Sequence, residues 1–592
     1  MDVGEMYLFL SLISSVISTY AFILGSIKKD FKLLRVGEKS LHLTTAFLTA
    51  SLLLLTYYFL ADDFNVAYVY LNSDLYLPLA YKISGVWAGK EGSLLLWIFY
   101  TSLLSSIFVN VERKDIELAK SLSIVCIFLN SLILIMVTTS NPFTRLGYTP
   151  TNGMGLNPLL RTLEMVFHPP TIFIGYAAVI FPFAVALVSY KFKRNWILFS
   201  WLFLTIGIFL GAWWAYKTLG WGGFWAWDPV ENASLLPWVT LTASIHLMFK
   251  SRKESYFLIV ASFILVIFAT FVTRSGIIKS VHAFGESLQG AVYLVLIVIF
   301  SALSIYFYLK NKEIRSKEIE ERKEEIEINP EKSFNKILSS QNILRIFLML
   351  MLFFVLAVLL GTVSNIFTAV ERNYYYTTAL PIFGLLVALI GVCFGIKRIK
   401  LSLPIASILS VIVFIYKGLI GALATFISTF SIFFLLDVGL KLKIQRIIKI
   451  LIHLGIILLF LGSAFVWMYE IKHENIILER GKTIEVDGIK IRYDDMFMKQ
   501  DDEKFTLIPF LTFNDNQIVL KQFVYKIERH ERVVNNVEII STPLFDYYLA
   551  LKGISEDFNT ITIDLYIIPL ISFVWAGFYL LMIGGYVALV RK

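Results

Sequence analysis

The residues best suited to chemistry lie in a tryptophan-rich segment, GAWWAYKTLGWGGFWAWDPVENASLLPW, which runs from Gly211 to Trp238. Its tryptophans are Trp213, Trp214, Trp221, Trp225, Trp227 and Trp238, with Trp201 just upstream. Indole rings are large, rigid and flat, so this density suits a planar, apolar ligand, and the Gly222-Gly223 pair lets the backbone approach it closely. An aromatic belt at a membrane interface is the simpler interpretation. A belt, however, requires neither paired glycines nor the polar residues Asp228 and Glu231.

Two histidines flank this segment in the sequence and are predicted to lie on the same side of a membrane. His168 precedes Pro169-Pro170, and His282 lies in the stretch TRSGIIKSVHAFGES. Two neutral imidazoles from separate segments can bind iron axially, one from each face of a porphyrin that rests on the tryptophans. The alternative is that both are polar interface residues that cap helix ends. Their position on either side of the tryptophans favours the heme hypothesis.

A second pair of histidines, His246 and His453, falls inside predicted membrane spans. Counting residues along each span places both about 20 Å below the outer surface, at 1.5 Å per residue. Ionisable residues in the hydrocarbon are candidates for function by default. The sharper hypothesis is a buried b-type heme with two histidine ligands, and the simpler one is a pair of interhelical hydrogen bonds. His42, His473 and His530 fit no such arrangement.

The elements that must position these residues are membrane helices. The chain has 592 residues, of which 57% are hydrophobic and 16% charged, and this composition is typical of an integral membrane protein. We predict an all-α polytopic fold of about 15 transmembrane helices with a small β-rich extracytoplasmic domain. The predicted spans are approximately 5–26, 41–60, 92–110, 118–138, 169–190, 195–213, 233–250, 255–273, 288–309, 343–366, 377–396, 402–416, 418–437, 449–469 and 563–590.

The basic residues predict the orientation of these helices. Lysines and arginines concentrate in one of the two alternating sets of loops, which includes 27–39 and 310–342. The positive-inside rule places this set in the cytoplasm, the N-terminus outside, the C-terminus inside and the tryptophan-rich segment on the extracytoplasmic face of a cytoplasmic (plasma) membrane. The net charge of +9 follows from these anchors, so no nucleic-acid partner is implied. The first span lacks a cleavage site and is expected to be retained.

The organisation along the chain follows from these segments. We predict an N-terminal transmembrane bundle (1–309), a charged cytoplasmic linker (310–342), a C-terminal bundle (343–469), an extracytoplasmic β-rich domain (470–562) and a final helix (563–592). In the β-rich domain, Thr483–Tyr493 and Val537–Ile540 alternate polar and apolar residues, as strands do. Cys126 and Cys393 form no Cys-x-x-Cys motif, which excludes thiol oxidoreductases and c-type cytochromes.

On these residues the chain resembles the CcmF-type cytochrome c heme lyases, a family of the tryptophan-rich "WWD" heme-handling proteins. The most specific motif is WGGFWAWDPVEN, at Trp221–Asn232. Asn157-Pro158-Leu159-Leu160 followed by His168-Pro169-Pro170 resembles the segment of one family histidine, and Thr273–Gly276 followed by Val281–Phe284 resembles that of the other. His246 and His453 fall where the family places its membrane histidines. One departure is Lys90, where the family usually has histidine; a lysine there is still able to bind a heme propionate.

The resemblance implies a lyase of cytochrome c maturation. Such a protein accepts heme from a membrane-tethered heme chaperone and promotes thioether attachment to the Cys-x-x-Cys-His motif of apocytochrome c, working with other maturation subunits in the lipid bilayer. The substrate heme is expected at His168, His282, Trp213, Trp214, Trp221, Trp225, Trp227 and Asp228. A buried heme b is expected on His246 and His453, as a possible supply of electrons. The iron ligands would be these histidines, and no residue is expected to act by covalent catalysis.

Three other interpretations remain open from the sequence. A heme exporter or carrier would bind heme without ligating it, and would need neither the buried histidines nor the β-rich domain. A quinone-linked electron carrier would use only the buried heme and would leave His168, His282 and the tryptophans without a role. A solute transporter would show ionisable groups near the membrane midplane, and few are present.

Overall fold

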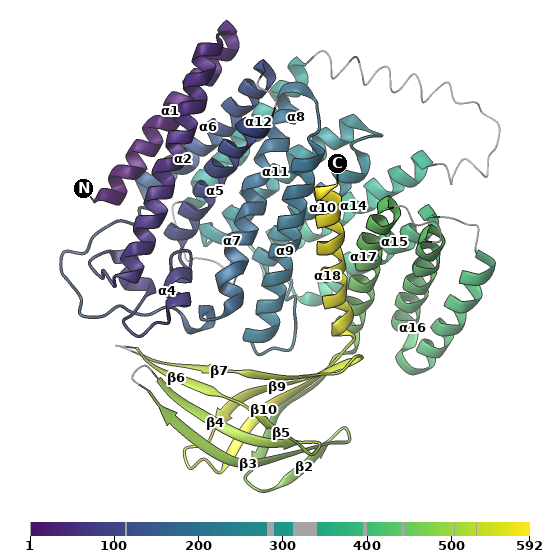
Figure 1. The fold of residues 1–592 in the computed structure, drawn as a ribbon. Helices are drawn as coiled ribbons and strands as arrows, with labels where there is room; N and C mark the ends of the chain where they lie inside the picture. The colour runs from purple at the N-terminus through teal and green to yellow at the C-terminus, as the bar shows by residue number, and fades with distance from the viewer. Residues whose placement is uncertain are drawn as a thin grey trace.

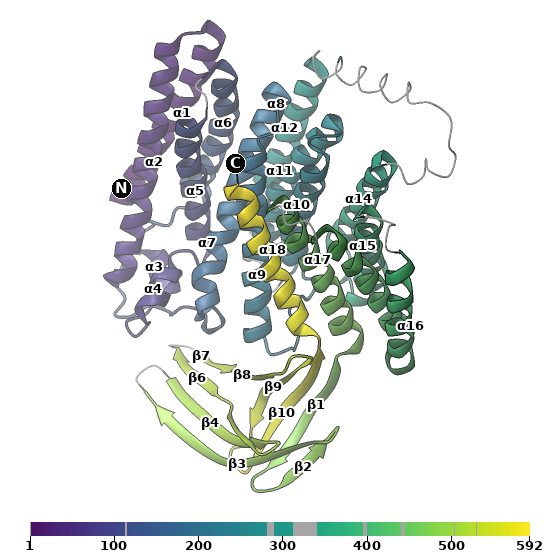
Figure 2. The same ribbon diagram turned by 45° about the vertical axis from the view of Figure 1, so that its right-hand side comes forward.

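The computed structural model describes residues 2–112, 115–280, 289–311, 316, 340–394, 399–439, 444–501, 504–527 and 530–591. These residues form two helical bundles and a β domain (residues 471–569), which lies beyond one end of the helices (Figures 1 and 2). Most of the predicted linker, 310–342, and the whole of the stretch around His282 lie outside the described residues.

The N-terminal bundle contains twelve described helices and a single 3₁₀ turn, within residues 2–311. They are α1 (Val3–Lys28), α2 (Phe31–Leu60), α3 (Ala67–Asn72), α4 (Leu79–Gly85), α5 (Lys90–Val111), α6 (Ile116–Thr139), η1 (Pro158–Leu160), α7 (Leu163–Ala178), α8 (Ile180–Ser189), α9 (Arg194–Thr218), α10 (Pro229–Leu247), α11 (Arg252–Ser275) and α12 (Gln289–Lys310). The C-terminal bundle contains α14 (Ser340–Ser364), α15 (Arg372–Phe394), α16 (Ile399–Gly439), α17 (Ile444–Tyr469) and α18 (Ile571–Val590).

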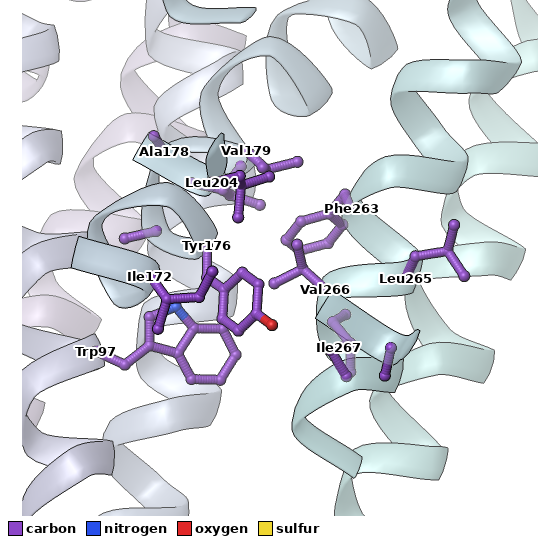
Figure 3. Packing of buried hydrophobic residues seen from close by; sticks show 14 of the residues in the cluster. Trp97, Ile172, Tyr176, Ala178, Val179, Leu204, Phe263, Leu265, Val266 and Ile267 are labelled. Carbon is purple, nitrogen blue, oxygen red and sulfur yellow. The ribbon is translucent and has the colours of Figure 1, made fainter. Parts of the chain in front are cut away.

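Aromatic side chains fill the core of the N-terminal bundle (Figure 3). The ring of Trp97 on α5 lies 5.6 Å from that of Phe128 on α6 and 6.3 Å from that of Phe173 on α7, measured between centroids. Phe183 of α8 stacks on Phe263 of α11 at 4.2 Å. Offset and edge-to-face ring pairs of this kind add stability beyond the area that they bury. The core therefore fixes α7 and α11, which carry the segments next to the predicted site.

Thirteen helices in the described part of the chain are long and apolar enough to cross a membrane, so the chain is a multi-pass membrane protein. The prediction of about 15 spans differs from this set in two places. α10 is absent from the set because its polar first turn and His246 lower its hydropathy. Residues 402–433 count as one candidate span, whereas the sequence predicts two.

The geometry at Gly418 explains the second difference. This glycine interrupts α16 with φ 70° and ψ −167°, a backbone conformation outside the helical region. The hydroxyl of Ser410 donates to the carbonyl oxygen of Ala422 at 2.9 Å, which a continuous helix would hold about 18 Å away. The hydroxyl of Tyr469 accepts from the amide of Gly421 at 2.6 Å and fixes the turn. The chain therefore reverses at Gly418, where the sequence predicts a break.

The β domain contains two antiparallel sheets. The strands are β1 (Ile471–Glu479), β2 (Thr483–Val486), β3 (Ile489–Gln500), β4 (Lys504–Phe513), β5 (Asn516–Val519), β6 (Gln522–Ile527), β7 (His530–Asn535), β8 (Val537–Ser541), β9 (Phe545–Ile554) and β10 (Thr560–Pro569). The order is β1-β10-β9-β8 in one sheet and β2-β3-β4-β6-β7 in the other, with β5 paired to β4. The predicted hairpin within Thr483–Tyr493 and the predicted strand at Val537–Ile540 are both present.

The predicted boundary at residue 562 is wrong, because β10 continues to Pro569 and α18 begins at Ile571. The cause is that β10 is buried on both faces. Leu565 packs into the interior of the β domain, whereas Tyr566 and Ile568 pack against the helices. A strand that is buried on both faces has a continuous apolar sequence, which periodicity alone does not distinguish from a membrane helix.

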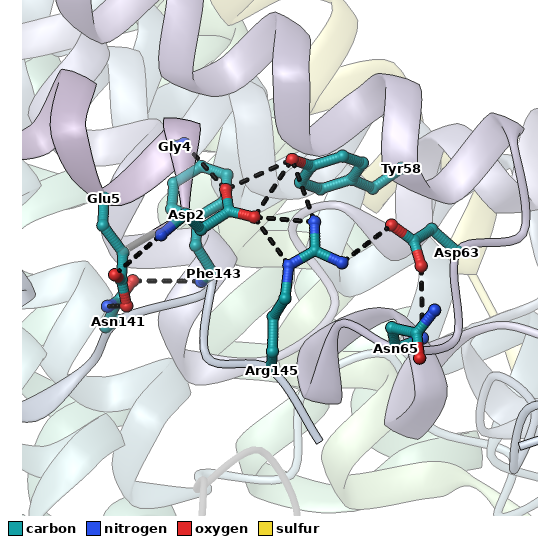
Figure 4. Close-up of polar contacts among 9 residues, drawn as sticks. All are labelled: Asp2, Gly4, Glu5, Tyr58, Asp63, Asn65, Asn141, Phe143 and Arg145. Atoms are coloured by element: carbon teal, nitrogen blue, oxygen red, sulfur yellow. Dashed lines mark hydrogen bonds and ion pairs between the residues drawn. The ribbon is translucent and has the colours of Figure 1, made fainter. Parts of the chain in front are cut away.

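A polar network fixes the N-terminus against the loop that follows α6 (Figure 4). Arg145 donates through Nε to the carboxylate of Asp2 at 2.8 Å, and its Nη1 lies 3.3 Å from the carboxylate of Asp63. The hydroxyl of Tyr58 donates to Asp2 at 3.2 Å. The Asp2 side chain is only 4% exposed, so its charge depends on these donors.

We expect Arg145→Ala to destabilise the protein by about 1–3 kcal/mol, since the buried carboxylate of Asp2 would lose its cation. The measurement is thermal or denaturant unfolding of the purified protein in detergent. The control is Lys191→Ala, which removes an ion pair with Glu117 whose side chains are 65% and 51% exposed. Exposed pairs contribute about 0–1 kcal/mol. Equal destabilisation by the two variants would contradict the role of Arg145 as the cation that balances the buried Asp2 carboxylate.

Candidate functional site

A cavity of about 280 Å³ lies between the two bundles, walled by α9, α10, α14, α15, α17 and α18. Its lining is almost entirely apolar and aromatic, and His246 and His453 are part of it. Trp225 and Trp227 of the tryptophan-rich segment also line it. The structure thus joins His246 and His453 to part of the tryptophan motif in one apolar cavity, whereas the sequence predicts two separate sites.

His246 and His453 face each other across this cavity, from α10 and α17. Their ring centroids lie 6.2 Å apart and the ring planes are at 86°. The Nδ1 atom of His246 lies 2.8 Å from the carbonyl oxygen of Thr242, and that of His453 lies 2.7 Å from the carbonyl oxygen of Lys449. Because a carbonyl only accepts, both Nδ1 atoms carry the hydrogen, which leaves the lone pair on Nε2.

This arrangement fits two axial ligands of one iron. A histidine nitrogen binds a metal at about 2 Å, and each ring centroid lies roughly 1 Å behind that nitrogen, so two opposed imidazoles place their centroids about 6 Å apart. Metal-binding histidines usually donate their second ring N–H to a carbonyl or carboxylate, as both do here. The donor set and its apolar surroundings are therefore suited to a heme with two histidine ligands.

Tryptophans of the segment pack against different helices of the C-terminal bundle. Trp227 stacks on Tyr375 of α15 at 4.6 Å and 2° and lies 5.3 Å from Trp467 of α17. Trp213, on α9, packs edge-on against Trp575 of α18 at 4.8 Å. One face of Trp227 is therefore covered by protein.

Trp214 and Trp221 have further partners. The indole N–H of Trp214 donates to the carbonyl oxygen of Leu159 at 3.2 Å, next to the segment that leads into His168. The guanidinium of Arg372 lies 4.4 Å from the ring centroid of Trp221, in a cation–π contact. Trp213, Trp214, Trp221 and Trp227 thus contact other parts of the fold, Trp225 packs edge-on against Trp227, and the segment links the two bundles.

Asp228 and Glu231 form a capping box at the start of α10, as helix capping predicts for these residues. The carboxylate of Asp228 accepts from the amide of Val230 at 2.9 Å, and that of Glu231 accepts from the amides of Ala226 and Asp228 at 2.8 and 3.1 Å. The hydroxyl of Ser280 also donates to Asp228, at 2.6 Å. Since Ser280 stands two residues before His282, Asp228 connects the tryptophan-rich segment to the stretch that carries the second predicted ligand.

His168 lies in the second turn of α7, against a face of α9 different from the one that lines the cavity. Its Nδ1 lies 2.8 Å from the carbonyl oxygen of Gly207, so this histidine also carries its hydrogen on Nδ1. A side chain at Gly211 would come within 2.9 Å of the ring, so only glycine leaves room for the imidazole there. His282 lies outside the described residues, and the pairing of the two histidines stays a prediction.

Lys90 is the first residue of α5, and hydrogen bonds join this start of α5 to the end of α11. Arg274, 1% exposed, donates to the carbonyl oxygen of Lys90 at 2.5 Å and to the hydroxyl of Ser93 at 2.8 Å. The Lys90 ammonium forms no ion pair within 4 Å among the described residues. Two stretches that the sequence analysis compared with the family, Gly89–Ser93 and Thr273–Gly276, therefore lie side by side.

Sequence analysis missed several residues of this region because they lie in the C-terminal half, outside any motif. Tyr375 and Trp467 cover the tryptophan-rich segment, and Glu470, between α17 and β1, lies against Gly222. One Glu470 oxygen lies 3.1 Å from the ammonium of Lys472, while Oε1 is buried with no hydrogen-bond partner among the described residues. The only signal for Glu470 in the sequence is an acidic residue at the end of an apolar span.

The environment of Glu470 predicts how the stability of the protein depends on pH. Burial raises the pKa of its carboxyl above the usual range, against the opposing effect of Lys472. A raised carboxyl pKa contributes stability that is complete below the unfolded-chain pKa, about 4.3, and is lost as pH rises through the folded-state pKa. We therefore expect Glu470→Gln to have a higher Tm than wild type at neutral pH, and the two to converge toward pH 4. A Tm difference that grows as pH falls would contradict this.

Known proteins resemble this chain in sequence and fold. Residues 87–279 match the family model described as "Cytochrome C assembly protein", a range that includes the tryptophan-rich segment, His168 and His246. The chain is 38% identical over 299 residues to the cytochrome c-type biogenesis protein NrfE of Haemophilus influenzae, covering 47% of each. It is 38% identical over 328 residues to CcmF of Pseudomonas aeruginosa, covering 52% of this chain and 50% of the relative. The matches span about half the length of these curated relatives.

A solved structure titled "Cytochrome c Heme Lyase CcmF" matches all of this chain and 98% of its own, with a TM-score of 0.81 and 20% identity. At this identity the match shows a shared fold, including the β domain. The chain is therefore a multi-pass membrane protein in which residues 87–279 are similar to the cytochrome c assembly proteins. Together the comparisons show similarity in sequence to cytochrome c-type biogenesis proteins and in fold to a structure titled as a cytochrome c heme lyase, in agreement with the resemblance in sequence.

Proposed function

We propose that this chain is the heme lyase subunit of a cytochrome c maturation system. It accepts heme from a membrane-tethered heme chaperone and promotes thioether attachment to the Cys-x-x-Cys-His motif of apocytochrome c, in a cytoplasmic membrane with its N-terminus outside. The observation that carries the proposal is shared by His168, His246 and His453. Each uses Nδ1 to donate to a backbone carbonyl and so presents Nε2 as the ligand.

The resident cofactor of this proposal is a heme b held by His246 and His453. The ring spacing of 6.2 Å and the apolar cavity support it, and heme bound there would supply a one-electron carrier. The residues of the chain hold the ligands in place. The carbonyl of Thr242 orients one imidazole, and the carbonyl of Lys449 orients the other.

The substrate heme is proposed to bind at His168 and His282, beside Trp213, Trp214, Trp221 and Asp228. The contact of Trp214 with Leu159 and the contact of Asp228 with Ser280 support this, because they bring the approaches to both histidines to one segment. Lys90 is a candidate for a heme propionate, since its ammonium has no carboxylate partner among the described residues. The contribution of the protein is orientation of the heme and the apocytochrome thiols, with no covalent bond to its own residues.

A count of heme tests this proposal against its alternatives. The purified chain should retain non-covalent b-type heme by pyridine hemochrome assay, and should bind further heme on titration, with only the further binding lost in His168→Ala. Retained heme with no further binding would instead favour an electron carrier. Further binding without retained heme would favour an exporter or carrier. No binding under any condition would contradict heme handling altogether.

A further inference from the structure

The β domain touches the tryptophan-rich segment at its glycine turn, residues 220–223. Val537 of β8 lies next to Gly220, with its Cγ1 4.0 Å from the position that a Cβ would take there. Gly222 is enclosed more tightly, because a Cβ would lie 2.8 Å from the Oε1 atom of Glu470 and 2.9 Å from the ring of Tyr566. With φ of 79° at Gly222, the turn has a backbone conformation that favours glycine.

Two tyrosines on neighbouring strands form the surface under this turn. Tyr548 of β9 and Tyr566 of β10 are directly paired across the sheet, with ring centroids 5.8 Å apart. They are 0% and 3% exposed. The hydroxyl of Tyr548 lies near the amides of Gly220 and Gly222 but has no hydrogen-bond partner among the described residues, so its contact with the turn is one of packing. The glycine turn therefore rests on a cross-strand tyrosine pair.

A carboxylate two residues before each tyrosine lies on the same face of its strand. Asp546, 4% exposed, accepts from the hydroxyl of Tyr216 on α9 at 2.8 Å, so it joins β9 to the helix that enters the tryptophan-rich segment. Asp564, 2% exposed, accepts from the hydroxyl of Tyr566 at 2.9 Å and pairs with Lys552 at 2.9 Å. These buried polar contacts have defined partners, whereas apolar packing alone would allow the domain to shift against the helix.

From these contacts we infer that the β domain positions the tryptophan-rich segment. Tyr548, Tyr566 and Asp546, here called the tyrosine seat, hold the glycine turn and thereby set where Trp221 and its neighbours present their rings. These are positioning residues, since they act through the turn rather than on heme. The inference rests on the proposed function for its heme consequence, but the contact itself is independent of that function.

Hydrogen–deuterium exchange of the full-length protein in detergent tests the contact without heme. We expect Gly222→Ala and Tyr566→Ala to accelerate exchange in a peptide covering residues 219–226, roughly fivefold to tenfold, since the first pushes the turn away from the Tyr566 ring and the second removes that ring. Two matched variants serve as controls. Gly481→Ala imposes the same left-handed strain at φ 75° where nothing lies within 4 Å, and Tyr493→Ala truncates another fully buried tyrosine of the β domain.

The exchange result decides whether the tyrosine seat holds the glycine turn. Faster exchange at 219–226 in the seat variants alone supports it, and unchanged exchange, or an equal change in the controls, overturns it. A hemin titration then tests whether the seat positions the tryptophan-rich segment for heme binding. The seat variants should weaken binding of added heme several-fold and leave the spectrum of any retained heme unchanged; unaltered affinity despite faster exchange would overturn that role. If the wild type binds no added heme, the proposed function fails, while the exchange result still decides the seat.

Discussion

Purified His246→Ala/His453→Ala protein is expected to lose its b-type heme completely, with disappearance of the sharp α and β bands of a reduced low-spin heme. The physical reason is that both of the proposed heme ligands belong to this pair, whose ring centroids lie 6.2 Å apart. Changing a mere hydrogen-bond partner of such a ligand already costs about 10–100-fold in metal affinity, so loss of both ligands should abolish retention. The measurement is a reduced-minus-oxidised spectrum with a pyridine hemochrome count.

The control for this variant is His473→Ala. His473 lies in β1 of the β domain, is not among the residues that line the cavity, and contacts Asp487 through its Nε2 at 2.7 Å. The His473→Ala variant also removes one histidine and should leave the heme spectrum unchanged. Full retention of heme in the double variant would contradict the assignment of both ligands. Retention in either single variant with a high-spin spectrum would agree with it, since one imidazole remains.

His168→Ala is expected to reduce covalent heme attachment to a co-expressed apocytochrome c by roughly 100-fold or more, because it removes a proposed ligand of the substrate heme. The heme on His246 and His453 should remain, since His168 lies against a different face of α9. The measurement is heme-stained cytochrome c, normalised to the amount of lyase in the membrane.

Thr171→Ala provides a matched control for that experiment. Thr171 lies on the same helix, and its hydroxyl bonds only within α7, to the carbonyl oxygen of Phe167 at 2.7 Å. Its replacement should leave attachment near the wild-type level. Normal attachment in His168→Ala, or simultaneous loss of the retained heme, would contradict a separate substrate site at this histidine.

Much of the fold could be predicted from the sequence, because membrane helices leave a strong hydropathy signal. The break at Gly418 could be predicted as well, since Lys417 and Gly418 interrupt an apolar run. The boundary near residue 562 could not, because the second half of β10, from Leu565 to Ile568, is apolar on both faces. Local sequence does not report what covers the second face of a strand. That information lies in α17 and in the glycine turn at Gly222, which are distant from β10 in the chain.

The candidate site also combines features that the local sequence predicts with features that it does not. Asp228 and Glu231 cap α10, and a capping box is a local pattern that the sequence itself carries. The packing of Trp227 could not be predicted, because it depends on Tyr375 and Trp467 of the other bundle. The tyrosine seat was missed for the same reason. Its residues come from strands more than 300 positions after the turn that they support.

The most direct test of the central claim is a complementation assay for covalent heme attachment. The gene is expressed in a strain that lacks its own heme lyase of this type but retains the other maturation proteins, together with an apocytochrome that carries Cys-x-x-Cys-His. The account predicts heme-stained cytochrome c with the α-band shift of a thioether-bound heme in pyridine hemochrome, and none with His168→Ala. Membrane-inserted, heme-loaded protein that produces no covalent cytochrome c, while an established lyase does so in the same strain, would contradict it.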